Sequence, residues 1–141
     1  MKFSKITHID NTDLESIHTL MRQLSSDAEP LNIENFNELI SKGNVSFFCA
    51  IKNKKITGML SLVYYETTTG IRSRIEDVIV LDEFRRQGIA VELIKIAIEE
   101  YSNSNSHSLE LTSNPKREAA NNLYIKLGFK IRKTNVYQYD D

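Results

Sequence analysis

Apolar residues recur at helical spacing near the start of this chain and at strand spacing further along it. A first helix is predicted by apolar residues three and four positions apart: Leu14, Ile17, Leu20, Met21 and Leu24. Thr12 and Glu15 have the spacing of a capping box at its start. A second helix is expected over residues 33–41, with Asn32 as its cap and Gly43 as its stop.

Several segments carry the pattern of strands. They cover residues 3–9, 45–51, 56–65, 72–81 and 109–111, with Ile131 and residues 136–139 finishing the sheet. The pair Asn53-Lys54 predicts a tight turn between two antiparallel strands. The second half of 72–81 is apolar at successive positions, which is typical of a central strand that is covered on both sides.

Two later helices complete the pattern. The helix from Val91 to about Tyr101 is apolar except for one narrow stripe, so we expect it to be deeply packed. The last helix is lined by Ala120, Leu123, Tyr124 and Leu127, and Gly128 ends it. With no repeat or linker, the sequence predicts a single domain over residues 1–141, an α/β layer fold around one sheet.

Composition narrows the class of protein. Forty per cent apolar and 26% charged residues are ordinary for a soluble domain. No apolar run approaches the ~20 residues of a membrane span, and Met1–Lys5 lacks an apolar signal core, so a cytoplasmic protein without a membrane partner is expected. A net charge of −1 argues against a nucleic-acid partner. The cluster Lys52, Lys54 and Lys55 is interpreted as a solvated turn.

Cysteine and histidine usage argues against a metal site. Cys49 is the only cysteine, which excludes an intrachain disulfide and a cysteine-cluster zinc site. Its apolar neighbours predict a buried thiol. His8, His18 and His107 are scattered without ligand spacing, so no metal is predicted.

The turn Arg85-Arg86-Gln87-Gly88-Ile89-Ala90 lies between the strand 72–81 and the next helix. Free N–H groups at a helix start favour bound anions, and Gly88 has no Cβ to block a close approach. Arg85 and Arg86 add cations that can reach phosphate oxygens. Without its context, the stretch is also compatible with an ordinary polar turn before a helix.

The context is a resemblance to the GNAT superfamily of acetyl-CoA-dependent N-acetyltransferases. Arg85 to Ala90 fits that family's Gln/Arg-x-x-Gly-x-Gly/Ala motif, and residues 114–129 resemble its next block. The resemblance covers residues 45–139 well. It implies a GNAT-like fold, with a central mixed, mostly antiparallel twisted sheet and helices on both faces. It also implies direct attack of a primary amine on the thioester of acetyl-CoA.

The resemblance assigns roles to particular residues. Main-chain groups of Val78, Ile79 and Val80 would pair with the pantetheine arm, and Asn121 would bind the arm or support the site. Arg85, Arg86, Gln87, Gly88, Ile89 and Ala90 would hold the pyrophosphate. Tyr124 matches the family's general acid and would protonate the departing thiolate; the alternative is that its ring only packs.

The general base is left open between several groups. Strand alternation predicts Arg74, Glu76, Val78 and Val80 on one face, with Ile75 and Asp77 on the other. Glu76 could take the amine proton, hold a cationic substrate, or pair with Arg72 or Arg74. Asp77 is the second choice, and a water chain is the third.

The acceptor amine is not identified by the sequence. It could be a small molecule or a protein amine, and the segment Met21–Phe36 would shape its pocket. The acids Asp27, Glu29 and Glu34 suggest a cationic acceptor, although a solvated acidic loop is favoured. Whether the protein forms a homodimer is also left open by the sequence. The alternative function is a non-catalytic CoA-binding module that regulates a partner.

Overall fold

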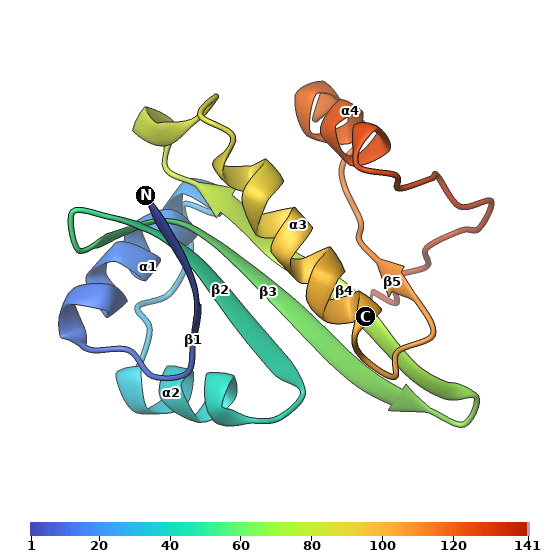
Figure 1. Cartoon of the computed structure of the whole chain (residues 1–141), viewed down its shortest axis with the longest axis horizontal. Helices are drawn as coiled ribbons and strands as arrows, with labels where there is room; N and C mark the ends of the chain where they lie inside the picture. The colour runs from blue at the N-terminus through green and yellow to red at the C-terminus, as the bar shows by residue number, and fades with distance from the viewer. Residues whose placement is uncertain (141) are drawn as a thin grey trace. The chain divides into compact units, whose positions relative to one another are not determined.

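The computed structural model describes residues 1–140 and divides into two compact units, one of them Met1–Leu111 and the other beginning at Thr112 (Figure 1). The elements of the first unit are β1 (Lys2–Ile6), α1 (Asn11–Leu24), α2 (Ile33–Ser41), β2 (Val45–Lys52), β3 (Lys55–Thr67), β4 (Gly70–Val80), a 3₁₀ turn η1 (Asp82–Phe84), α3 (Ile89–Ser102) and β5 (Leu109–Glu110). The second unit contains α4 (Glu118–Lys126). No helix within residues 1–140 has the length and apolar character needed to cross a membrane.

The five strands form one sheet in the order β1-β2-β3-β4-β5. The first three neighbouring pairs are antiparallel, whereas β5 runs parallel to β4. The parallel pair is short and joins Ser73 to Leu109 and Arg74 to Glu110. The predicted α/β fold with a mixed, mostly antiparallel sheet is therefore confirmed.

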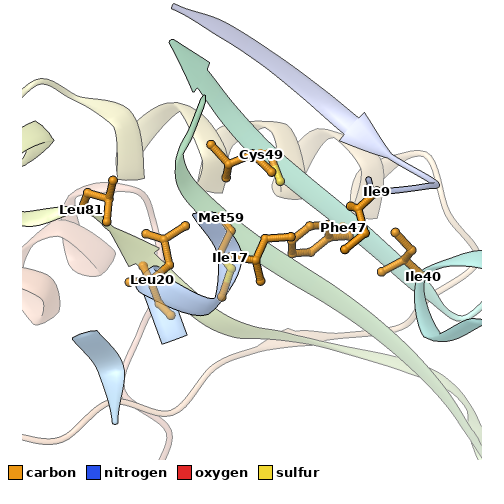
Figure 2. Close-up of a cluster of buried hydrophobic side chains, with 10 residues drawn as sticks. Ile9, Ile17, Leu20, Ile40, Phe47, Cys49, Met59 and Leu81 are labelled. Carbon is orange, nitrogen blue, oxygen red and sulfur yellow. The ribbon is translucent and has the colours of Figure 1, made fainter. Parts of the chain in front are cut away.

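One face of the sheet packs against α1 and α2. Figure 2 shows this core, in which Ile17 and Leu20 of α1 and Ile40 of α2 lie with apolar side chains of the strands. The strand residues include Phe47, Cys49, Met59 and Ile79. The ring of Phe36 meets that of Phe47 edge-on at 5.2 Å between centroids. Cys49 is fully buried here, as predicted.

The other face of the sheet packs against α3, whose Leu93, Ile94 and Ala97 are fully buried. Helix and sheet approach closely at Gly58, where a Cβ atom would lie 2.9 Å from Cγ2 of Ile89. A side chain at residue 58 would therefore push the first turn of α3 away from the sheet. Helices thus cover both faces of the sheet, with α1 and α2 on one side and α3 on the other.

The local signals were confirmed in part. Helix α2 spans the predicted residues, and the side chain of Asn32 accepts a hydrogen bond from the Asn35 N–H at 3.0 Å. The predicted stop at Gly43 was wrong, because Lys42 is the C-cap residue and Gly43 is not in the left-handed conformation of a glycine cap. Asn53 and Lys54 both have positive φ, 51° and 63°, as a tight hairpin turn requires. The capping box of α1 was misplaced by two residues, because Asp10 and Asp13 form it.

The strands expected after α4 are absent from the described part of the chain. Residues 129–140 contain no strand, and the side chains expected to finish the sheet are exposed: Ile131, Val136, Tyr137 and Tyr139. A strand requires a partner for its main chain, and strand propensity alone does not provide one. The prediction for Ile131 and residues 136–139 was therefore wrong.

Candidate active site

The turn before α3 is anchored at both ends and exposed between them. Leu81 donates its N–H to Thr57 O at 2.9 Å and is buried, so the turn starts from a fixed point on β3. Phe84 packs against the α1 core, and Ile89, the first residue of α3, is buried against the sheet near Gly58. The four residues between these anchors, Arg85 to Gly88, are all exposed.

The start of α3 leaves main-chain donors available. Gly88 is the N-cap residue, with φ of 78° in the left-handed region, and no side chain within the described residues caps the helix there. The first helical hydrogen bond runs from Glu92 N to Gly88 O at 3.1 Å. The N–H groups before Glu92 therefore lack helical partners and can bind an anion, which the helix dipole also favours. This geometry fits a pyrophosphate group.

Two ion pairs and one cation–π contact involve the residues of η1 and the turn that follows it. The guanidinium of Arg85 lies 2.9 Å from the carboxylate of Asp82, and Lys55 lies 3.7 Å from Glu83. Lys52 sits over the ring of Phe84 at 5.4 Å. All four paired charged side chains are more than half exposed, so a phosphate can compete for Arg85 at little cost.

The outer edge of β4 is open toward its carboxyl end. In the described part of the chain β5 pairs with β4 only at Ser73 and Arg74, so residues 75–80 have no strand partner on that side. A ligand that resembles an extended peptide can pair with such an edge. The predicted pantetheine contacts, Val78 to Val80, lie on this open edge.

A β-bulge interrupts β4 at this edge. Glu76 pairs with Ser61 and Ile79 with Met59, so Leu60 of β3 faces two residues, Asp77 and Val78. Asp77 has φ of 52°, a conformation that costs energy for most residues but that Asp tolerates. Such strain is common where a strand must present its main chain to a ligand.

The bulge corrects the predicted alternation. Glu76 pairs with Ser61 on the α1 face, whereas Val80 pairs with Gly58 on the α3 face. The prediction that Arg74, Glu76, Val78 and Val80 share one face was therefore wrong. Regular alternation ends at the extra residue of the bulge, and every side chain after it changes face.

Two carboxylates lie next to each other at the bulge. Glu76 accepts a hydrogen bond from Arg74 Nε at 2.9 Å, one of the pairings that the sequence left open. Partial desolvation raises the pKa of the Asp77 carboxyl above its ordinary value, and the negative charge of Glu76 raises it further. A carboxyl group with a raised pKa is a better proton acceptor than an ordinary one when it is ionised.

The two site residues on α4 belong to the second unit. Tyr124 is buried, and its ring meets that of Phe129 edge-on at 6.1 Å. The side-chain amide of Asn121 donates to Asn114 O at 3.0 Å, so it holds the loop before α4. Within that unit the packing role of Tyr124 is present. The assignments of Tyr124 and Asn121 to acid catalysis and cofactor binding stay predictions.

The opposite end of α3 is polar but internally bonded. The carboxylate of Glu100 accepts from Lys5 Nζ at 2.8 Å, Ser46 Oγ at 2.9 Å and Tyr64 OH at 2.8 Å. A groove of about 660 Å³ lies beside this cluster, lined by Gly43, Asn44, Tyr64, Tyr65, Glu66, Ile71, Asn105 and Ser106. None of the predicted site residues lines it.

Other reactive groups are placed away from this chemistry. Burial, and secondly the charge of Asp13, raises the pKa of the Cys49 thiol far above its ordinary value, so the thiol stays protonated. Within residues 1–140 no group of three or more His, Cys, Asp or Glu side chains is positioned to hold a metal ion.

One contact at this site has no signal in the sequence. Gln23 of α1 binds the main chain on either side of Leu81, at Val80 and at Asp82. The bulge had a weak signal, because an aspartate is unusual within an apolar strand. Within the first unit, Glu76, Val78 to Val80 and Arg85 to Ala90 follow one another along the end of β4 and the turn into α3.

The site has an open strand edge, a bulge and an uncapped helix start. The sequence that forms it also matches the model of a known protein family. The model of the acetyltransferase (GNAT) family matches residues 11–129, so the chain belongs to that family. The chain is similar to the aminoalkylphosphonate N-acetyltransferase of Salmonella typhimurium, with 26% identity over 139 residues, covering 92% of this chain and 87% of that protein.

Solved structures show the same fold. A protein of Agrobacterium tumefaciens, provisionally assigned as an acetyltransferase, has a TM-score of 0.84 at 20% identity, with 99% of this chain and 100% of that chain covered. A transcriptional regulator from Bacillus halodurans has a TM-score of 0.79 at 27% identity, with 99% of each chain covered. The predicted family and fold are therefore confirmed.

Proposed function

We propose that this protein transfers the acetyl group of acetyl-CoA to a primary amine of a small molecule. The observation that carries the proposal is the continuity of β4 and α3. An open strand edge at Val78 to Val80 leads through one anchored turn to the uncapped start of α3. A pantetheine arm needs main-chain partners and a pyrophosphate needs free N–H groups, and the chain offers them in that order.

The proposed reaction is direct attack of the amine nitrogen on the thioester carbon. The amine must lose a proton, and the CoA thiolate that leaves must gain one. Glu76 lies on the face of the sheet that packs against α1. Asp77 is next to it in β4, and the pKa of its carboxyl group is raised. We assign proton acceptance to this pair of carboxylates, directly or through water, and proton donation to the phenol of Tyr124.

The acceptor is proposed by class. The relative with 26% identity acts on aminoalkylphosphonates, which combine a primary amine with an anionic phosphonate. These compounds are therefore the first acceptors to test. Matched alkylamines without the phosphonate, polyamines and amino-acid derivatives form the rest of the panel. They test whether the acids Asp27, Glu29 and Glu34 hold a cationic acceptor or only form a solvated loop.

The test measures CoA thiol release and the mass of the acetylated product across this panel. We expect both to appear with at least one amine and to require acetyl-CoA. Binding of acetyl-CoA without release from any of these small amines would reject a small-molecule acceptor of these classes and leave a protein amine or the non-catalytic CoA-binding module. Absence of acetyl-CoA binding would reject the use of acetyl-CoA altogether.

Tyr124→Phe sharpens this test, because it removes one hydroxyl group and keeps the ring that packs on Phe129. With an active acceptor, we expect kcat to fall by about 100-fold, the scale of lost acid–base assistance. The melting temperature and the Kd for acetyl-CoA should change little. A wild-type kcat, measured while chemistry limits the rate, would leave Tyr124 with packing alone.

A further inference from the structure

Gln23, next to the last residue of α1, joins that helix to the end of β4. Its Nε2 donates to Val80 O at 2.7 Å, and its Oε1 accepts from Asp82 N at 2.9 Å. The amide thus donates to the carbonyl group of one residue and accepts from the N–H group two residues later. A residue of a neighbouring strand would make the same two hydrogen bonds. The side chain is only partly buried, so these bonds are not required to satisfy a fully buried amide.

The position of these bonds matters because of what surrounds them. On the inner side, Leu81 is held by Thr57 O of β3 at 2.9 Å. On the outer side, the pairing of β5 with β4 does not extend beyond Arg74 of β4. Gln23 therefore supplies the outer support for the residues that connect the open edge of β4 to the turn before α3.

We propose that Gln23 is a positioning residue for acetyl-CoA, an inference that rests on the proposed function. Holding Val80 and Asp82 fixes the direction in which the chain leaves β4 and so orients the free N–H groups before Glu92. A preorganised anion site binds more tightly than one that must be ordered on binding. The bond to Val80 O also directs the pantetheine arm to Val78, Ile79 and the N–H of Val80.

The same contact links the two sides of the active site. The last residues of α1 belong to the segment Met21–Phe36, which would shape the acceptor pocket. A displacement of the end of α1 changes the support of the cofactor turn through Gln23. Coupling of this kind is reciprocal, so acetyl-CoA that orders the turn also fixes the end of α1.

The test uses Gln23→Met, which keeps the length of the side chain and removes both hydrogen bonds. Arg22→Met is the matched control, since Arg22 is exposed in the same turn of α1 and contacts His18 of its own helix. The Kd for acetyl-CoA is measured by calorimetry well below the melting temperature of each variant. Hydrogen exchange at the Asp82 amide is measured without ligand.

We expect Gln23→Met to raise the Kd for acetyl-CoA by about tenfold, the scale of two modest hydrogen bonds. It should also speed exchange at the Asp82 amide, while Arg22→Met leaves both values near wild type. A lowered melting temperature with an unchanged Kd would show that Gln23 only stabilises the fold and would overturn the proposal.

Two further outcomes are decisive. If Gln23→Met does not fold, Gln23→Asn replaces it, because an amide that is one methylene shorter cannot reach both main-chain atoms. The same two values then support or overturn the proposal. If wild-type protein shows no binding of acetyl-CoA, the proposed function fails and the role of Gln23 fails with it. An unchanged Kd in the variant alone rejects only the role of Gln23.

Discussion

The two ends of α3 differ in how their polar groups are satisfied. At the C-terminal end, the carboxylate of Glu100 accepts three hydrogen bonds from β1, β2 and β3. At the N-terminal end, no side chain caps the helix within residues 1–140, and the four residues Arg85 to Gly88 are exposed. The internally bonded end of the helix contributes to fold stability, and the open end is the one that we propose for ligand binding.

The largest effect is expected at the open end, from Gly88→Leu. Its Cβ would meet no protein atom within 4 Å, so the side chain would extend into the space where a phosphate approaches. The φ of 78° adds backbone strain. We expect the Kd for acetyl-CoA to rise by about 100-fold or more, equivalent to about 2.8 kcal/mol.

Thermal shift with increasing acetyl-CoA measures this effect. Gly43→Leu is the matched control, because Gly43 also has open space around its Cβ but lies near the other end of α3. Acetyl-CoA should raise the melting temperature of the Gly43→Leu variant as much as that of the wild-type protein. A Gly88→Leu variant that is folded and binds normally would place the pyrophosphate elsewhere and remove the contrast between the two ends.

A smaller effect, on stability alone, is expected from Glu100→Ala. The substitution leaves the hydroxyl groups of Ser46 and Tyr64 without their acceptor, and Ser46 is buried. We expect a loss of about 2 kcal/mol in the free energy of unfolding, the scale of bonds to a charged group. The ion pair with Lys5 is lost as well, but its contribution is limited because the Lys5 side chain is about half exposed.

Urea unfolding measures this loss, with Glu99→Ala as the control because Glu99 is exposed in the same helical turn. Acetyl-CoA affinity should stay at the wild-type value in both variants. A large loss of affinity in Glu100→Ala would show that the two ends of α3 are coupled rather than separate.

The smallest effect is expected from pH. Desolvation raises the pKa of Glu100, but hydrogen bonds from Lys5, Ser46 and Tyr64 and the charge of Lys5 outweigh it, so the pKa is lowered overall. Its contribution to stability is therefore present above the unfolded pKa of about 4.3 and is lost as pH falls through the folded value. Urea midpoints between pH 6 and pH 3 should fall less steeply for Glu100→Gln than for wild type; parallel curves would contradict this.

The sequence predicted elements whose signals are local. Asn32 marked the start of α2, and Asn53-Lys54 marked the hairpin turn, because a cap and a tight turn depend on a few neighbouring residues. Alternation failed in β4, since one extra residue at Asp77 is compatible with the same apolar composition. The strand expected at Ile131 also failed, because that apolar residue is exposed and has no strand beside it in the described part of the chain.

The candidate site was also predicted only in part: its contiguous motif was found, and its long-range contact was not. The turn Arg85 to Ala90 is contiguous in the sequence, so its motif was visible. The contact of Gln23 with Val80 joins residues 57 positions apart and depends on how α1 packs on the sheet. A contact of this kind leaves no local pattern in the sequence, because Gln23 binds main-chain atoms and these are the same whichever side chain stands at residue 80.

The bulge in β4 also affects how related sequences should be aligned. Insertions and deletions are usually expected in loops, where an added residue disturbs few contacts. In β4, one residue divides a segment facing α3 at Ile75 from a segment facing α1 at Ile79. A relative without the bulge would need its one-residue gap inside the strand, at Asp77 or Val78, for its core positions to correspond to those of this chain.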